Sequence, residues 1–452
     1  MKPRRMIDVA KAVDGRLVGE DVEVNSVATD SRSVVPGALF IALAGERTDG
    51  ARFVADAFAS GAAGALVPDG TQGAPAVVVR STGEALLHLA ADERQRMDAT
   101  IVGITGANGK TSTKDLTAAV LATALLTHAS PGSFNNEIGL PVTLLTAPAE
   151  TQVVVAEMGA RRKGDVAELC TIACPDIIVV TNVGLAHIEI FGSWDAIVEA
   201  SAEPVEALGS DGVAILLADD PVLSGYRDRC AGRVVTFGLS ASADVRATDV
   251  GLGADGCAAF TVVASEESSP VKLSVAGEHM VPNALAAIAV GRELGVSLAD
   301  AAGALAHARV SRWRMETFTT AEGVRVVNDA YNANPESVAA AIKAARWMAG
   351  GANLIAVLGP MAELGSVAMI EHERIGELAA RLRVDRLITV GAGAYPIAIA
   401  GLREGVEPDN VASYDRGEDA LADVREHARP GDVVLFKASR VAGLEKLAEA
   451  LR

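Results

Sequence analysis

Apolar runs alternate with helix-like patterns through the middle of the chain, from about residue 98 to about residue 310. Parallel strands that are buried on both faces have continuous apolar sequences, and a helix usually connects one strand to the next. The strand-length runs lie at residues 100–104, 152–156, 177–181 and 213–217. The pattern therefore predicts a central parallel-sheet domain, with a further helix at about residues 282–294.

The segment from residue 233 to residue 276 has a different pattern. Its apolar runs are short, and many turn residues separate them. Such a pattern is typical of antiparallel strands joined by tight turns. We therefore expect an inserted or appended antiparallel patch in the central domain.

The two ends of the chain predict two further domains. Residues 1–97 combine a short apolar strand at 39–43 and a helix-like run at 53–63 with Gly and Asp between them, which favours a small mixed α/β domain. From residue 311 onward, strands and helices alternate again, as in a doubly wound, Rossmann-like domain. Its predicted strands are 324–327, 354–358, 386–390 and 433–436, and its predicted helices are 335–349 and 371–382.

Length and composition agree with this division. The chain has 452 residues, half of them apolar, and at about 150 residues per domain this length indicates roughly three domains. We expect an α/β fold with domains at residues 1–97, 98–310 and 311–452, the central one like that of P-loop ATPases.

The net charge of -18 argues against a nucleic-acid partner. Phosphate backbones are bound by basic surfaces, because released counterions supply much of the affinity. The chain also has no apolar run near the ~18 residues of a membrane span, and its start does not resemble a signal peptide. We therefore expect a cytoplasmic protein that does not insert into membranes.

The strongest local motif covers residues 103–112, with the sequence Gly-Ile-Thr-Gly-Ala-Asn-Gly-Lys-Thr-Ser. It follows an apolar strand and leads into a helical run that we expect to begin near Lys114. A glycine-rich turn lets backbone N–H groups close around phosphate oxygens, and the helix N-terminus adds positive charge. We expect Lys110 to contact phosphates and the Thr111 hydroxyl to bind Mg²⁺. Ile104 stands where the common form of this loop has Gly, which argues for a special subclass.

Two polar residues follow the next predicted strands. Glu157 comes at the end of the run 152–156, and His187 follows the strand 177–181 by a short loop. Open α/β sheets bind ligands at the carboxyl ends of their strands. Glu157 is therefore a candidate Mg²⁺ ligand, although a solvated strand end is an equally good interpretation. His187 is either a second site residue or an exposed loop histidine.

Together these motifs resemble those of the Mur ligases over nearly the whole chain. The matching segments of the central domain are residues 133–141, 156–159, 182–187 and 191–193, besides the phosphate loop. The resemblance implies ATP and Mg²⁺ as cofactors, with Lys110, Glu157, His187 and Arg314 as catalytic residues. It assigns the metal ions to Thr111, Glu157 and His187. It assigns the nucleotide to Gly106, Ala107, Asn108, Gly109, Lys110, Thr111, Ser112, Asn283, Arg314 and Asp329, with His279 in the adenine-side segment.

The resemblance also places the substrates. Asp30, Ser31 and Arg32, before the apolar strand at 36–43, match the region that binds the UDP-sugar, and this assignment depends on the resemblance alone. The sequence Asn-Asp-Ala-Tyr-Asn-Ala-Asn-Pro at 328–335 is similar to the D-alanyl-D-alanine-adding type of the family. The implied substrate residues are Asp30, Ser31, Arg32, Asn136, Tyr331, Asn332, Asn334, Lys437, Ser439 and Arg440.

The implied reaction joins D-alanyl-D-alanine to UDP-N-acetylmuramoyl-tripeptide through an acyl phosphate, as in peptidoglycan precursor synthesis. The implied enzyme is an ADP-forming ligase, and we expect it to act as a monomer. Two other interpretations stay open. One is a family member with another acceptor. The other is a weakly active paralogue that binds nucleotide and serves as a regulatory partner.

Two positions depart from the family pattern. An acidic residue is frequent where this chain has Pro360. More importantly, Ser201 stands where the family has a lysine that becomes carbamylated and bridges metal ions. Serine cannot form that carbamate, so activity is expected to be reduced, independent of CO₂, or supported by a substitute such as Glu199 or Glu203.

Overall fold

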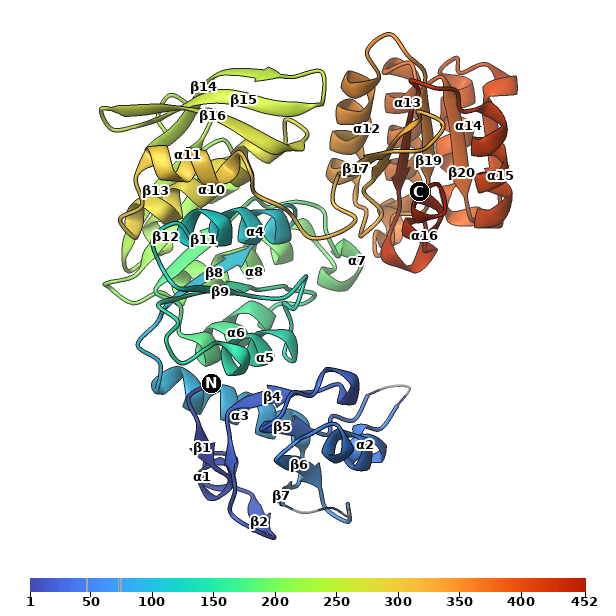
Figure 1. Cartoon of the computed structure of the whole chain (residues 1–452). Coiled ribbons are helices and arrows are strands. Elements are labelled where there is room, and N and C mark those ends of the chain that lie inside the picture. Colours follow the sequence, from blue (N-terminus) through green and yellow to red (C-terminus); the bar gives the residue numbers. More distant parts are fainter. Residues whose placement is uncertain (46–47, 72, 74) are drawn as a thin grey trace.

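The computed structural model describes residues 1–45, 48–71, 73 and 75–452. Across these residues the strands form three main sheets of five, nine and six strands, which follow one another along the chain. Figure 1 shows the three sheets as separate regions, with the first at one end of the molecule and the third beside the central one. We call them the first, central and third regions.

The first region is built on a mixed sheet in the order β2-β7-β6-β5-β4. Strands β4 to β7 run parallel, and β2 pairs antiparallel with β7. The bounds are β1 (Arg4–Arg5), β2 (Arg16–Val18), β3 (Glu23–Val24), β4 (Ser26–Ala28), β5 (Ala38–Ile41), β6 (Gly64–Pro68), β7 (Ala76–Val79), α1 (Met6–Ala12), α2 (Val54–Ala59) and α3 (Thr82–Gln95). The helix predicted at 53–63 is shorter than expected, because the chain turns at Gly61, whose φ is 104°.

The central region has a nine-stranded sheet in the order β16-β15-β14-β13-β12-β11-β8-β10-β9. Its strands are β8 (Thr100–Thr105), β9 (Thr127–Ala129), β10 (Val153–Glu157), β11 (Ile177–Val180), β12 (Val213–Leu217), β13 (Arg233–Gly238), β14 (Val245–Leu252), β15 (Cys257–Ala264) and β16 (Glu267–Ala276). Its helices are α4 (Lys110–Leu121), α5 (Gly139–Thr146), α6 (Asp165–Ala173), α7 (Ile188–Phe191), α8 (Trp194–Glu206), α9 (Pro221–Ser224), α10 (Met280–Glu293) and α11 (Leu298–Leu305).

Side chains on the two faces of this sheet enter different cores. Val102 and Ile104 of β8 pack into a core with helices α4 and α10. Ile101 of the same strand packs into a second core with α3, α5 and α6. The alternation along a strand thus explains why both faces of β8 are apolar.

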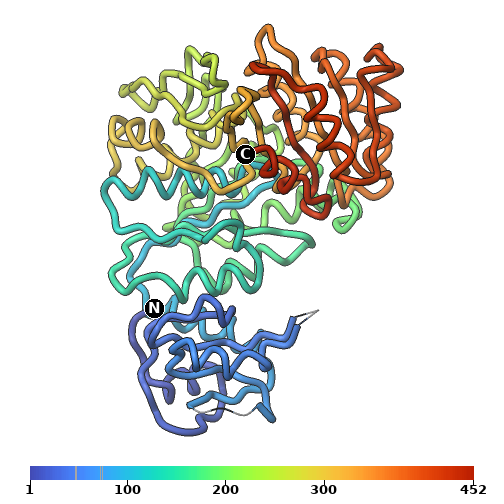
Figure 2. The backbone as a smooth tube through the Cα atoms, turned by 45° about the vertical axis from the view of Figure 1, so that its right-hand side comes forward, coloured from blue at the N-terminus to red at the C-terminus, as the bar shows by residue number. Residues whose placement is uncertain are grey.

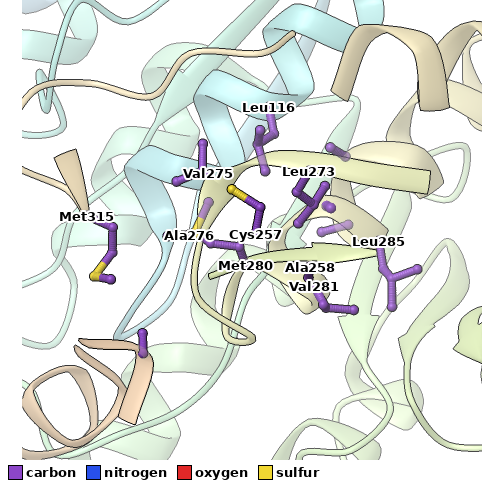
Figure 3. Packing of buried hydrophobic residues seen from close by; sticks show 14 of the residues in the cluster. Leu116, Cys257, Ala258, Leu273, Val275, Ala276, Met280, Val281, Leu285 and Met315 are labelled. Carbon is purple, nitrogen blue, oxygen red and sulfur yellow. The ribbon is translucent and has the colours of Figure 1, made fainter. Parts of the chain in front are cut away.

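The antiparallel patch predicted at 233–276 is part of the same sheet. Strand β13 pairs parallel with β12, so it continues the parallel sheet, whereas β15 pairs antiparallel with both β14 and β16. Figure 3 shows Cys257 and Ala258 of β15 in one apolar cluster with Leu116 of α4 and Met280 of α10. The patch is therefore covered by the helices of the central region.

The third region has the strand order β17-β18-β22-β19-β20-β21, parallel except for the edge strand β17. Its strands are β17 (Glu316–Thr319), β18 (Arg325–Asn328), β19 (Leu354–Leu358), β20 (Arg386–Val390), β21 (Val411–Tyr414) and β22 (Val433–Lys437). Its helices are α12 (Pro335–Ala349), α13 (Ala368–Arg381), α14 (Tyr395–Arg403), α15 (Gly417–His427) and α16 (Glu445–Glu449). The predicted doubly wound domain is confirmed.

Apolar cores extend across both boundaries between the regions. Helix α3 of the first region shares a core with α5 and α6, and Met348 of α12 belongs to the same core as Cys257 of β15. Figure 2 shows the third region against the central one, with the first region at the opposite end. Among the described residues, no helix has both the length and the apolar character that crossing a membrane requires.

Candidate active site between the central and third regions

The phosphate loop lies between β8 and α4, at the carboxyl end of β8, which is an inner strand of the sheet. Helix α4 begins at Lys110, four residues before the expected start near Lys114. The first turn, Lys-Thr-Ser, has no apolar periodicity and therefore gives no helical signal in the sequence. Because the first amides of a helix lack partners within the helix, Lys110, Thr111 and Ser112 supply a positive helix end to the loop.

At two positions of this loop, neighbouring atoms leave no room for a side chain, so only glycine fits. Gly106 has φ of 131°, and a Cβ atom there would lie 2.2 Å from Thr181 Oγ1. Gly109 has φ of 80°, and a Cβ atom there would lie 2.5 Å from Asn283 Oδ1. Ile104 is a buried residue of β8, so the glycine turn begins two residues later than in the common motif.

Residues after β11 hold the loop in shape. Thr181 Oγ1 donates to the Asn108 carbonyl at 2.6 Å, and Asn182 Nδ2 donates to the same carbonyl at 3.1 Å. The Asn108 N–H donates in turn to Asn182 Oδ1 at 2.8 Å. These bonds preorganise the turn without any ligand.

The Lys110 ammonium folds back onto its own loop. Nζ donates to the Gly106 carbonyl at 2.5 Å and to the Ala107 carbonyl at 3.3 Å. Burial lowers the pKa of Lys110, and the nearby carboxylate of Glu157 acts in the opposite direction. The cation therefore lies inside the turn that would surround a phosphate.

Glu157 has the surroundings of a metal ligand. Its side chain is about 1 % exposed, and Asn135 Nδ2 donates to Oε1 at 2.8 Å. The other oxygen, Oε2, is buried without a hydrogen-bond partner among the described residues. Buried carboxylate oxygens are normally paired, and Mg²⁺ prefers carboxylate and hydroxyl oxygens. With the Thr111 hydroxyl in the same cleft, the oxygens present fit Mg²⁺.

An arginine from the start of the third region reaches the loop. Arg314 Nη2 donates to Ser133 Oγ at 3.0 Å, and Ser133 Oγ lies 3.2 Å from Thr111 Oγ1. The guanidinium lies 4.2 Å from the ring centre of Tyr331, a cation–π distance that fixes its plane. Ser133 thus connects the phosphate-loop helix to a cation from the third region.

The predicted acceptor residues form a hydrogen-bonded group around Lys437. Its Nζ lies 2.7 Å from Asp329 Oδ2 and donates to the Asn332 carbonyl at 2.8 Å. Ser439 Oγ accepts from the Ala362 N–H at 2.8 Å. Arg440 stacks on Trp313 at 4.2 Å, with much of its side chain in solvent. Both cations have a carboxylate partner within the protein, because Lys437 pairs with Asp329 and Arg440 Nη1 lies 3.1 Å from Glu445 Oε1.

His187 meets a carboxylate from the third region. Its Nδ1 is bonded to Glu363 Oε2, and Arg161 is paired with the other oxygen of Glu363. Burial lowers the pKa of His187, although Glu363 acts in the opposite direction. Burial alone would raise the pKa of Glu363, but Arg161 and His187 bring it below its usual value. The histidine therefore lies at the boundary between the two regions.

These groups line one cleft of about 940 Å³ between the central and third regions. His279 also lines it, and burial lowers the pKa of this histidine. The predicted site residues that line the cleft are Ala107, Asn108, Gly109, Lys110, Thr111, Ser112, Asn136, Glu157, His187, Asn283, Arg314, Asp329, Tyr331, Asn332, Asn334, Lys437, Ser439 and Arg440. Gly106 belongs to the phosphate loop but does not line the cleft, and its carbonyl accepts from Lys110.

The predicted UDP-sugar residues lie elsewhere, in the first region. Asp30 accepts hydrogen bonds from the backbone and the guanidinium of Arg32, and these bonds lower the pKa of Asp30 to about 2. Arg32 is exposed, and Asp30, Ser31 and Arg32 do not line the cleft. The structure therefore does not bring these three residues together with the nucleotide residues.

The departures at Ser201 and Pro360 have specific structural surroundings. Ser201 lies on α8 and does not line the cleft. The suggested substitutes are already engaged, because Glu199 pairs with Arg229, and Glu203 accepts from the Gly164 and Ala167 N–H groups at the start of α6. The Pro360 carbonyl accepts from the Ser439 N–H at 3.0 Å.

Sequence reasoning did not assign several residues of the cleft. Ser133, Asn135 and Asn182 lie in the recognised motifs, but their sequence gives no sign of which partner they contact. Thr181 is the polar end of an apolar run, which is a usable signal for a strand end at a site. Arg161 and Glu363 are far apart in the chain, so their contact is visible only in three dimensions.

Family models cover most of the chain in three segments. They are the Mur ligase family catalytic domain at residues 23–94, the Mur ligase middle domain at 104–291, and the Mur ligase glutamate ligase domain at 313–440. The second and third matches coincide with the two regions that form the cleft.

Individual proteins match over nearly their whole length. The UDP-N-acetylmuramoyl-tripeptide–D-alanyl-D-alanine ligase of Mycobacterium bovis is 42% identical, over 94% of this chain and 92% of its own length. The ligase of the same name from Bacillus subtilis is 37% identical, over 100% and 99%. A crystal structure of MurF from Acinetobacter baumannii has a TM-score of 0.86 and 31% identity, covering 100% of this chain and 99% of its own. MurF ligase from Thermotoga maritima in complex with ADP has a TM-score of 0.80 and 29% identity, with 95% and 97% covered.

Proposed function

The chain belongs to the Mur ligase family, and we propose that it is the ATP-dependent ligase that joins D-alanyl-D-alanine to UDP-N-acetylmuramoyl-tripeptide. Relatives that carry this name match it from end to end. The observation that carries the proposal is the cleft itself, in which a preformed phosphate loop faces Arg314, Tyr331 and Lys437 of the third region. A ligase needs such an arrangement because its nucleotide and its acceptor must meet.

ATP is assigned to the loop and to the first turn of α4. The backbone amides, Lys110 and Arg314 are assigned to the phosphates, and Asn283 and Asp329 are assigned to the rest of the nucleotide. This assignment is supported by the glycine turn, by the helix N-terminus and by the position of Arg314 beside Thr111.

Mg²⁺ is assigned to Thr111 and Glu157, and a second ion to His187. The first assignment is supported by Oε2 of Glu157, which has no hydrogen-bond partner in the part of the chain that the structure describes. When bound, the metal would neutralise phosphate charge and orient the transferred group. The second ion is assigned to His187 alone, and the Nδ1 atom of this histidine is bonded to Glu363.

The first step transfers the γ-phosphoryl group of ATP to the terminal carboxylate of the tripeptide. The P–O bond to the β-phosphate breaks, a new P–O bond to the carboxylate oxygen forms, and ADP leaves. Two anions approach each other in this step, so the cations Lys110 and Arg314 act by neutralising charge. Both belong to the cleft, and Arg314 has a buried Nε without a partner among the described residues.

The second step is attack of the D-alanyl-D-alanine amine on the acyl phosphate. A C–N bond forms, phosphate leaves, and the amine loses a proton. Tyr331, Asn332, Asn334, Lys437, Ser439 and Arg440 are assigned to the dipeptide and its surroundings. Arg440 supports this, because it lines the cleft, about half of its side chain is exposed, and a guanidinium that already pairs with Glu445 at one nitrogen keeps further N–H groups for a terminal carboxylate.

The UDP-sugar is assigned to Asp30, Ser31 and Arg32 of the first region. A nucleotide-sugar that carries a peptide is a long molecule, so its two ends can bind separate sites. Asn136, which lines the cleft, is assigned to the peptide end. The protein is proposed to act as a monomer, and the use of ATP and a UDP-linked precursor supports action in the cytoplasm.

Release of ADP tests this function directly. Purified protein is incubated with ATP, Mg²⁺ and UDP-N-acetylmuramoyl-tripeptide, with and without D-alanyl-D-alanine, and both ADP and the pentapeptide product are measured. We expect the product to form only when the dipeptide is present. A product with another amine, tested one acceptor at a time, would indicate another specificity. Nucleotide binding without any acceptor-dependent ADP would indicate a non-catalytic paralogue.

A further inference from the structure

An ion pair between a buried lysine and a partly buried aspartate lies on α4, one turn beyond the phosphate loop. The Lys114 side chain is about 2 % exposed, and its Nζ lies 2.7 Å from Asp115 Oδ1. The same ammonium donates to the carbonyls of Ser130 at 2.7 Å and Gly132 at 3.0 Å. All three of its N–H bonds therefore have acceptors, and the charge holds the backbone of residues 130–132 against the helix.

The Asp115 carboxylate holds a different segment. Its Oδ2 accepts from the N–H of Ser311 at 2.6 Å and from the Ser311 hydroxyl at 2.8 Å. Ser311 lies between α11 and β17, in the segment that leads into the third region. The pair thus fastens the beginning of this segment to the phosphate-loop helix.

The two fastened segments carry neighbouring site residues. Gly132 directly precedes Ser133, and Ser311 precedes Arg314 by three residues. Arg314 donates to Ser133 at 3.0 Å, so the contacts close a ring that starts and ends on α4. Ser133 also lies 3.2 Å from the hydroxyl of Thr111. The part of the ring formed by Ser133 and Arg314 therefore lies at the predicted phosphate site.

A buried pair of charges is not the simplest way to fill this space. Burying two charges has a desolvation cost that an apolar pair would avoid, so such a pair adds little stability by itself. It fixes geometry, however, because each atom of the pair requires a directed partner. In this ring every such partner belongs to a segment that ends at the phosphate site.

We propose that Lys114 and Asp115 are positioning residues, which hold Ser133 and Arg314 in place for the γ-phosphate through the backbone of residues 130–132 and through Ser311. The proposal deepens the proposed function and rests on it in one respect, namely that Arg314 acts on the phosphate that is transferred. Neither Lys114 nor Asp115 lines the cleft, so each acts through other residues.

The test compares Asp115→Asn, Ser311→Ala and Lys114→Met with the matched control Thr117→Val. Thr117 is buried on the same helix, and its hydroxyl has no partner among the described residues. The measurements are the affinities for ADP and for a nonhydrolysable ATP analogue, kcat with the proposed substrates, and hydrogen–deuterium exchange of residues 309–315. Lys114→Met is the variant most at risk of misfolding. If it does not fold, the test depends on the other two variants.

For Asp115→Asn and Ser311→Ala we expect the affinity for the ATP analogue to fall about tenfold, the size of one lost charge-assisted contact. The affinity for ADP should stay within about twofold, because ADP lacks the γ-phosphate. Exchange at 309–315 should become faster, and kcat should fall, while Thr117→Val matches the wild type. The variant that combines Asp115→Asn with Ser311→Ala should bind the analogue as well as Asp115→Asn alone. Both changes break the same contact, so their effects do not add.

Equal losses of ADP and analogue affinity, or unchanged exchange at 309–315, would overturn the proposal. A lower unfolding temperature with unchanged nucleotide preference would also overturn it, because the pair would then be only structural. If the wild-type protein releases no ADP with the proposed substrates, the proposed function fails. The analogue-to-ADP preference and the exchange data still decide the positioning role in that case.

Discussion

The side-chain amide of Asn334 donates a hydrogen bond of 2.7 Å to Asn108 Oδ1, so the third region contacts the phosphate loop directly. Asn334 has a second role, because its Oδ1 accepts from the Ser337 N–H and caps helix α12. One residue therefore contacts both the nucleotide loop and the start of the helix beside the acceptor residues.

These two roles can be separated by Asn334→Asp. Aspartate is as good an N-cap as asparagine, so we expect the unfolding temperature to change little. It cannot donate to Asn108, and its charge would face both Oδ1 and the phosphates. ATP affinity should fall about tenfold, corresponding to about 1–2 kcal/mol, as measured by calorimetry. Undiminished ATP affinity would mean that the contact does not couple the regions.

Lys110→Ala should abolish ligation and leave the fold intact. The ammonium is the cation placed inside the phosphate loop, and its loss should lower ADP release by more than about 100-fold. The exposed Lys343 on α12 offers a control, since Lys343→Ala should leave ADP release unchanged. Near-normal phosphate release by Lys110→Ala, with both substrates present, would contradict the assigned loop.

Glu157→Gln should separate stability from activity. Oε2 of Glu157 is a buried oxygen without a partner in the described part of the chain, and removing the charge relieves its desolvation in protein that is free of metal. We expect an unchanged or higher unfolding temperature without Mg²⁺, together with a loss of ligation that excess Mg²⁺ restores only weakly. Scanning calorimetry and ADP release over a Mg²⁺ titration check this. Wild-type Mg²⁺ dependence in the variant would exclude Glu157 as a ligand.

Acid should selectively weaken a buried network in the third region. Burial alone would raise the pKa of Asp423, but hydrogen bonds from Arg386 and Tyr414 bring the pKa below its usual value. The two Arg386 bonds measure 2.5 Å and 2.6 Å. A lowered folded-state pKa stabilises the protein above the unfolded-state pKa of about 3.9, and this stabilisation is lost as pH falls through the lower folded-state value.

We therefore expect Asp423→Asn to destabilise the protein by about 3 kcal/mol at pH 7, since it leaves Arg386 without its ionic partner. The difference from the wild type should shrink as pH falls below about 4. Urea unfolding at pH 7 and at lower pH measures both quantities. A difference that is independent of pH would show that the ionised carboxylate is not what stabilises the network.

Ser201→Lys tests the missing carbamate. If the position serves the metal site, lysine should raise turnover and make it sensitive to bicarbonate, because only an amine forms a carbamate. Turnover is measured with and without added bicarbonate, and Ser201→Met provides a control of similar length without an amine. Equal turnover in all three proteins would mean that this position does not bridge metal ions here.

Much of the fold could be predicted from continuous apolar runs. The predicted bounds 213–217, 354–358 and 386–390 coincide with β12, β19 and β20, and the helix predicted at 335–349 coincides with α12. These elements have sharp signals at both ends, such as the Asn-Pro pair that starts α12. The predicted start of α4 is four residues late, because Lys-Thr-Ser contains no apolar residue that would indicate a helix.

The site was predicted less completely for a physical reason. Motifs identify residues that belong together, such as Lys110 and Thr111, but the partners of a side chain depend on how distant segments pack. The bonds from Asn135 to Glu157 and from Glu363 to His187 join different elements, and no local pattern indicates them. The roles assigned to individual residues, and the domain boundaries, stay predictions.

The ammonium of Lys110, bonded to two carbonyls of its own turn, also bears on how nucleotide leaves. An incoming phosphate must replace these internal bonds, so part of each favourable contact with the nucleotide is offset by a contact that the empty protein already has. ADP is therefore held less firmly than its number of contacts implies. Such a turn accepts and releases successive nucleotides without having to refold between reaction cycles.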